Sequence, residues 1–127
     1  MIKILLAEDN MRIRNMIAHM LQYAGYEVLQ AASLSEIDNF FNDQDPNRPH
    51  IDLLIIDKQF EGTDDGLNKI VELRQRGEVF PIILCTATEA QDASIRKSPA
   101  NKHIAHIIEK PFVYQDFVNA VKSVLAP

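Results

Sequence analysis

Polar residues of several kinds stand at the ends of short apolar runs in this sequence. The acidic pair Glu8 and Asp9 follows IKILLA, and Asp57 ends the run IDLLIID. Thr86 ends the run PIILCT, and Lys110 ends IAHIIEK. A carboxylate can attack phosphorus as a nucleophile, while an ammonium group and a hydroxyl can stabilise the charged oxygens of a transferred phosphoryl group. The residue types therefore indicate phosphoryl transfer, provided that one fold brings them together.

The elements that would position these residues are five short, nearly continuous apolar runs. Such runs are typical of strands buried on both faces, as in a parallel sheet that is covered by helices. They span residues 2–7, 26–32, 51–57, 81–87 and 104–110. The candidate residues therefore stand at the carboxyl ends of expected strands.

Segments with helical spacing of apolar residues alternate with these strands. The second begins at the capping-box pattern of Ser33 and Glu36. The third helix covers residues 67–77 and the fifth covers residues 117–125. The fourth helix lies within residues 89–98, and we expect it to be short and mobile because few apolar residues occur there. The first is the clearest, and the side chains that we expect in the core are Ile13, Met16, Ile17, Met20, Leu21 and Ala24.

This alternation predicts a flavodoxin-like, doubly wound α/β fold, (βα)5, with a five-stranded parallel sheet in the order 2-1-3-4-5. Sites in such sheets lie at the carboxyl ends of the strands, and the first, third and fourth strands are neighbours. We therefore expect Glu8, Asp9 and Asp57 to lie within a few ångströms of one another. Three like charges at that separation require a compensating cation, and oxygen ligands favour Mg²⁺.

Length and composition exclude several other classes of protein. The chain of 127 residues suits one domain, 1–127, and its net charge of −5 provides no basic surface for nucleic acid, so we expect no direct nucleic-acid binding. No apolar run is long enough to cross a membrane, and no signal peptide is visible, so we expect no membrane contact and a cytoplasmic location. The single cysteine, Cys85, lies in an apolar run and is expected to be buried and inert.

Over its whole length the chain resembles a response-regulator receiver domain of two-component signalling, a member of the CheY-like superfamily. Four motifs carry the resemblance, in order and each at an expected strand end. They are Glu8 with Asp9, the lone Asp57, Thr86 with Ala87, and Lys110 with Pro111 and Phe112.

The resemblance implies that Asp57 accepts a phosphoryl group from a sensor histidine kinase or a histidine phosphotransfer protein. Mg²⁺ would be held by Asp9, Asp57 and the main-chain carbonyl of Gln59, with Glu8 acting through a water molecule. Lys110 would pair with the phosphoryl group, and the peptide bond that follows Lys110 would be cis. Such a domain is a signalling module rather than an enzyme, since it promotes only its own phosphorylation and dephosphorylation.

The resemblance also implies how the signal leaves the site. Thr86 would turn toward the phosphoryl group and alter the face made by the fourth helix, the fifth strand and the fifth helix, where we expect Ile95 and Ile107. This face would act on a downstream output protein, or on an output domain that is missing from this sequence. It also offers a surface for a homodimer.

The sequence departs from the family pattern at several positions. The loop after Asp57 has Glu61 where a proline is often found, and it contains one extra residue before its Asp-Gly pair. Ile107 stands where the family usually has Tyr or Phe, the aromatic side chain whose rotamer switch is coupled to the threonine. Gln59 and Thr88 occupy positions that tune dephosphorylation in the family.

Three alternatives remain open from the sequence. The chain could be a degenerate receiver that binds partners without phosphorylation, or the N-terminal part of a longer transcriptional regulator. A phosphatase of the haloacid dehalogenase-like kind also uses an aspartate after a strand. That enzyme needs a second acid two residues after the nucleophile, where Gln59 stands.

Overall fold

The computed structural model describes residues 1–127 and contains one parallel sheet of five strands in the order β2-β1-β3-β4-β5. This is the predicted flavodoxin-like order. The strands are β1 (Lys3–Ala7), β2 (Glu27–Ala31), β3 (Leu53–Asp57), β4 (Ile82–Thr86) and β5 (His106–Glu109). The helices are α1 (Met11–Tyr23), α2 (Leu34–Asn39), α3 (Asp65–Gln75), α4 (Ala93–Arg96) and α5 (Tyr114–Leu125), with a 3-10 turn, η1 (Asn101–His103), before β5.

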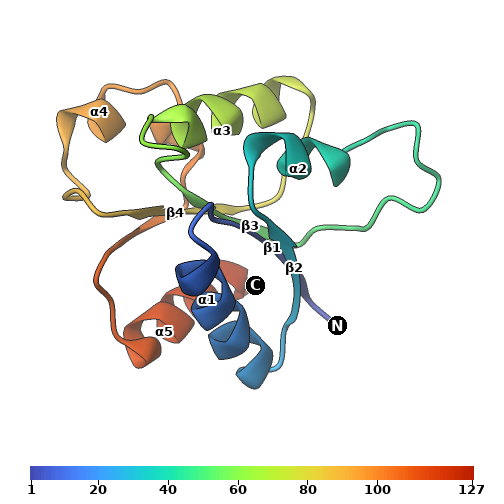
Figure 1. Ribbon diagram of the computed structural model, residues 1–127, viewed down its shortest axis with the longest axis horizontal. Helices are drawn as coiled ribbons and strands as arrows, with labels where there is room; N and C mark the ends of the chain where they lie inside the picture. The colour runs from blue at the N-terminus through green and yellow to red at the C-terminus, as the bar shows by residue number, and fades with distance from the viewer.

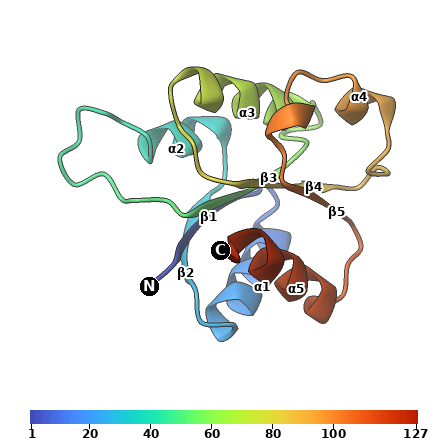
Figure 2. The same cartoon turned by 180° about the vertical axis from the view of Figure 1, so that it is seen from behind.

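The helices cover both faces of the sheet (Figures 1 and 2). Helices α1 and α5 lie on one face, and α2, α3 and α4 lie on the other. Every residue of β3 and β4 is buried, which explains why these two strands are almost continuously apolar in sequence. The side chains of the central strands alternate between two separate cores, one under each helical layer.

Local signals mark both ends of α1 and the start of α2, whereas α3 and α5 begin two and three residues earlier than the apolar spacing predicts. The Asn10 side chain accepts a hydrogen bond from the Ile13 N–H at the start of α1, and Ser33 does the same for Glu36 at the start of α2. Gly25, with φ of 102°, takes the left-handed conformation just after α1. The fourth helix is short, as predicted, with four residues.

Two side chains differ from our expectations, one drawn from helical spacing and one from the family resemblance. Met16 is 48% exposed, so it does not belong to the core as we expected, although Met20 on the next turn is partly buried. Ile95 is fully buried under the α3 and α4 layer and therefore cannot form part of an outer face. Helix α4 has a single turn, and its one large apolar side chain is turned inward.

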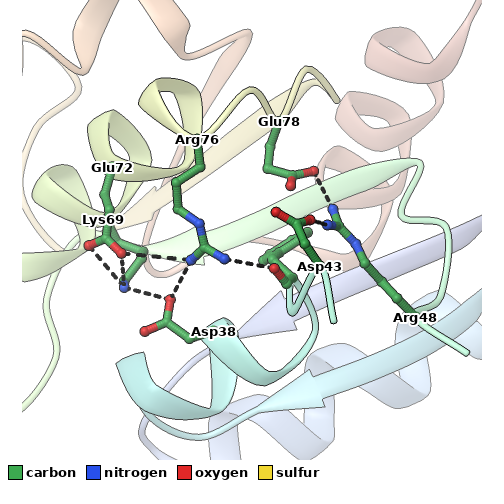
Figure 3. Close-up of polar contacts among 8 residues, drawn as sticks. Asp38, Asp43, Arg48, Lys69, Glu72, Arg76 and Glu78 are labelled. Carbon is green, nitrogen blue, oxygen red and sulfur yellow. Dashed lines mark hydrogen bonds and ion pairs between the residues drawn. The ribbon is translucent and has the colours of Figure 1, made fainter. Parts of the chain in front are cut away.

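A polar network joins α2 to α3 at the rim of the sheet (Figure 3). The buried Lys69 ammonium lies 2.9 Å from Asp38 and 3.0 Å from Glu72, and Arg76 donates a hydrogen bond to Asp38 at 3.3 Å. Burial lowers the pKa of Lys69, but the hydrogen bonds to Asp38 and Glu72 outweigh this and raise it above its usual value. This network orients the short helix α2 against its longer neighbour.

Candidate functional site

A polar pocket of about 200 Å³ lies at the carboxyl edge of the sheet. A larger hollow of about 540 Å³ lies near the opposite edge, beside the loops that precede β3 and β4, but it does not contain the groups of the predicted site. All the side chains that the sequence singles out line the polar pocket, namely Glu8, Asp9, Asp57, Gln59, Thr86 and Lys110.

The sheet register brings these residues to one place. Asp57 is the last residue of β3 and pairs in register with Cys85 of β4, while Thr86 is the last residue of β4. Helix α3 packs closely on the end of β3. The surroundings of Gly66 show this, since a Cβ atom on Gly66 would lie 2.0 Å from the Asp57 carbonyl oxygen. A larger residue in place of Gly66 would therefore push α3 away from the end of β3.

The ammonium group of Lys110 joins two of the acidic residues. Its Nζ lies 2.8 Å from Glu8 Oε1 and also donates to Asp57 Oδ2. The other oxygen of Asp57, Oδ1, accepts a hydrogen bond of 3.0 Å from the Gln59 N–H. The peptide bond between Lys110 and Pro111 is cis, as the resemblance implies.

The electrostatics of this group show an excess of negative charge. The pKa of Glu8 is raised to about 7, by its burial first and by the adjacent Asp57 second, and Lys110 only partly offsets these two effects. For Lys110, burial lowers the pKa, but its hydrogen bonds to Asp57 and Glu8 outweigh burial and raise the pKa above its usual value. The site therefore has an affinity for further positive charge.

Asp9 lies at the exposed rim of the same pocket. Its Oδ2 accepts a hydrogen bond of 2.8 Å from the Glu61 N–H, across the loop that follows β3. Burial acts to raise the pKa of Asp9, but the Glu61 bond and other hydrogen bonds bring it below its usual value. Glu61 itself has a φ of 52°, which is uncommon for a residue with a side chain, in the loop where the sequence departs from the family pattern.

Thr86 is buried, and its hydroxyl is already hydrogen-bonded to a neighbour. Thr86 Oγ1 lies 2.7 Å from Thr88 Oγ1 and accepts a 3.0 Å hydrogen bond from the Thr88 N–H. It has no hydrogen bond to Asp57. Cys85, beside it in β4, is buried as predicted, and burial raises the pKa of its thiol to about 12.

Lys58 is a buried charge that the sequence reasoning missed. It follows Asp57 directly, and its side chain is only 4% exposed. Lysine is almost never fully buried unless it is paired. The sequence contained a signal for this burial, because Lys58 stands next to the candidate nucleophile at the end of a strand that is buried on both faces.

The donor set of the pocket fits a hard divalent cation. The available ligands are carboxylate and main-chain oxygens, and the carboxylates of Glu8, Asp9 and Asp57 share the pocket with one ammonium group, that of Lys110. No three side chains of His, Cys, Asp or Glu are placed to hold a metal ion together, since Asp9 is bonded to Glu61 while Glu8 and Asp57 share Lys110. Mg²⁺ needs only one or two carboxylates when waters and a phosphoryl oxygen complete its octahedron.

The sequence also matches a known protein family. Residues 4–122 match the family model described as the response regulator receiver domain. The chain belongs to this family. Receiver domains are the signalling domains of two-component response regulators rather than classical enzymes, so this chain is a signal-transduction domain.

Solved structures agree with the family in sequence and in fold. The response regulator TrrA of Thermotoga maritima, in complex with Mg²⁺ and BeF, is 28% identical with a TM-score of 0.80, over 98% of this receiver domain and all of TrrA. The chemotaxis protein CheY4 of Vibrio cholerae is 25% identical with a TM-score of 0.81, over 98% of this chain and 99% of CheY4.

Curated relatives are longer proteins. The phosphate regulon transcriptional regulatory protein PhoB of Pseudomonas aeruginosa is 33% identical over 125 residues, which are 96% of this receiver domain and 51% of PhoB. The swarming motility regulation protein RssB of Serratia marcescens is 27% identical over 95% of this chain and 52% of its own length. The chain thus spans about half the length of these relatives. None of its helices combines the length and the apolar character that crossing a membrane requires.

Proposed function

We propose that this receiver domain accepts a phosphoryl group on Asp57 and uses it to switch a protein–protein interaction surface. The observation that carries the proposal is the setting of the Asp57 carboxylate. It lies in the polar pocket, in contact with the Lys110 ammonium and beside the buried Glu8. This setting provides a nucleophile and a cation for the incoming charge within one small space.

In the proposed transfer, a carboxylate oxygen of Asp57 attacks the phosphorus of a phosphohistidine. The donor is a sensor histidine kinase or a histidine phosphotransfer protein. A P–O bond forms as the P–N bond breaks, and the electron pair of the broken bond stays on the histidine nitrogen. Lys110 already contacts Asp57, so its ammonium group is placed to neutralise a phosphoryl oxygen without a large movement.

Thr86 would supply a hydrogen bond to the phosphoryl group. Its hydroxyl lies in the same pocket and shares a 2.7 Å hydrogen bond with the Thr88 hydroxyl, in which either group can donate, so in the phosphorylated state the Thr86 proton must point toward the phosphoryl group. A buried side chain that changes its hydrogen-bond partner also changes the packing around it. Through β4 and the β4–α4 loop this change would reach α4, which gives the switch a physical route.

Mg²⁺ is the proposed cofactor. Asp9, Asp57 and the main-chain carbonyl of Gln59 would hold the ion, and Glu8 would act through a water molecule. When bound, Mg²⁺ supplies positive charge that offsets the carboxylates and the oxygens of the phosphoryl group. Asp9 would exchange its hydrogen bond from the Glu61 N–H for this role.

The proposed output surface is the face formed by α4, β5 and α5. Because Ile95 is buried, the face must be formed by other residues of these elements, with the half-buried Ile107 beneath them. We propose that it contacts an output protein or an output domain of a longer regulator, and that it can support a homodimer. Residues 1–127 would form one receiver domain in either case.

Intact mass spectrometry after incubation with acetyl phosphate tests the acceptor. Wild type with Mg²⁺ should gain the mass of one phosphoryl group, and Asp57→Asn should gain none, because the amide keeps the shape but is not a nucleophile. Asp116→Asn, which alters an exposed carboxylate on α5, is the matched control and should gain the group normally. Uptake by Asp57→Asn would overturn the assignment. No uptake by wild type, together with no Mg²⁺ binding by NMR, would favour a phosphorylation-independent binding module.

A further inference from the structure

Lys58, which directly follows Asp57 in the chain, lies where three segments meet. Its Nζ is 3.5 Å from Thr88 Oγ1 in the β4–α4 loop, 3.6 Å from Asp64 Oδ1 and 4.0 Å from Asp92 Oδ1. Asp64 and Asp92 occupy the N-cap positions of α3 and α4. One side chain therefore contacts the start of two helices and the loop that carries Thr88.

These contacts are poor compensation for burying a charge. The side chain of Lys58 is 4% exposed, yet every acceptor is 3.5 Å or more from its Nζ, whereas strong charge-assisted hydrogen bonds measure about 2.7–2.9 Å. Replacing a buried ion pair by an apolar residue of similar size is often neutral or stabilising. The stability of the fold therefore does not explain a lysine here, while departures from such local rules are common at functional sites.

Lys58 connects to the site through two hydroxyl groups. Lysine can only donate hydrogen bonds, so Thr88 Oγ1 accepts from it. The positive charge repels the Thr88 hydroxyl proton and turns it away from Lys58, toward Thr86 Oγ1 at 2.7 Å. Thr86 Oγ1 already accepts from the Thr88 N–H, so in this arrangement its own proton is left free to donate.

The opposite arrangement would work against phosphoryl binding. If Thr86 donated to Thr88, its proton would be occupied and would not be available to an oxyanion on Asp57. Thr88 Oγ1 makes no hydrogen bond other than those with Lys58 and Thr86, so the charge of Lys58 is the local influence that distinguishes the two directions.

We infer that Lys58 is a positioning residue that acts through Thr88 to leave the Thr86 hydroxyl proton free for a phosphoryl group on Asp57. The inference rests on the proposed function, because it concerns the same phosphoryl group. Lys58 does not itself contact the phosphoryl group in this arrangement. Its effect passes along the chain of hydrogen bonds from Lys58 to Thr88 to Thr86.

The test is a double-mutant cycle on the rate of phosphorylation by acetyl phosphate with Mg²⁺. Lys58→Met keeps the length of the side chain and removes its charge, and Thr88→Val keeps the shape and removes the hydroxyl. Each single variant should be phosphorylated about three- to tenfold more slowly, the loss expected for one hydrogen bond. The double variant should be no slower than the slower single variant, because both changes break the same chain.

Stability and charge are controlled separately. Lys58→Met should unfold in urea at the same midpoint as wild type or above it, although it is phosphorylated more slowly. If Lys58 had only a structural role, slower phosphorylation would be accompanied by a lower midpoint. Lys102→Met removes an equal charge from an exposed lysine of η1 and should be phosphorylated at the wild-type rate. A wild-type rate for Lys58→Met, or losses that multiply in the double variant, would overturn the inference. Failure of wild type to be phosphorylated would instead contradict the proposed function.

Discussion

At the scale of single residues, one ammonium group holds the candidate site together. Lys110 contacts Glu8 and Asp57, whose side chains are only 3% and 9% exposed. Two carboxylates buried side by side repel each other, and the raised pKa of Glu8 reflects its burial first and its proximity to Asp57 second. Lys110 therefore stabilises the resting protein in addition to its proposed role in phosphoryl transfer.

This role predicts a large effect on stability. Lys110→Met should lower the free energy of unfolding at pH 7 by about 2–4 kcal/mol, because removal of one partner leaves buried charge uncompensated. Urea unfolding followed by circular dichroism measures the change. Adding Asp57→Asn to Lys110→Met should recover part of the loss, since only one of the two carboxylates then remains. Equal losses in the single and the double variant would contradict this explanation.

At the scale of elements, α4 is the shortest of the α-helices. It is one turn long and buries a single side chain, Ile95, whereas α1 has 13 residues and buries three. Its first turn depends on the Asp92 side chain, which accepts a hydrogen bond from the Ser94 N–H. A helix this short has no stability of its own apart from its contacts. The proposed output face therefore includes an element that a small change at the site can move.

Hydrogen exchange tests this difference between the helices. The amides of residues 93–97 should exchange at least about tenfold faster than those in the middle of α1, because local opening of α4 exposes little apolar surface. Mass spectrometry of peptides from the two segments measures both rates in one sample, so α1 is the internal control. Equal protection of the two helices would show that α4 is held more firmly than its contacts suggest.

At the scale of the whole molecule, folding creates the acidic site from residues far apart in the chain. Lys110 and Glu8 are separated by 102 positions, and Lys110 and Asp57 by 53. The carboxyl edge exists only when β1, β3, β4 and β5 are paired, so anything that binds this edge must bind the folded state preferentially. Binding at the site and global stability are therefore linked.

Addition of Mg²⁺ should consequently raise the midpoint of thermal unfolding. At a concentration about 100 times its dissociation constant, a ligand that binds only the folded state stabilises it by about 2.7 kcal/mol. Asp9→Asn should lose most of this gain, because Asp9 is one of the proposed ligands. KCl at matched ionic strength is the control for general screening of the negative charge. A similar rise with KCl, or an undiminished rise in Asp9→Asn, would contradict a specific site.

The element order and the strand order were predictable, because they follow from local patterns. Continuous apolar runs indicate strands buried on both faces, and right-handed connections between parallel strands leave few possible topologies. The strand ends were less accurate: β5 begins at His106, two residues later than the apolar run that indicated it. The exposure of Met16 was also missed, since helical spacing indicates one apolar face but not how much of it the sheet covers.

The sequence by itself determined the fold and the identity of the residues at the carboxyl edge, because residue type and strand period are local properties. Only the tertiary structure decided how these residues pair: Lys110 between Glu8 and Asp57, Asp9 with the Glu61 N–H, and the buried Lys58 beside Thr88. Long side chains reach several partners, and loop conformation and helix packing select among them. Those selections depend on segments distant in sequence, so no local pattern contains them.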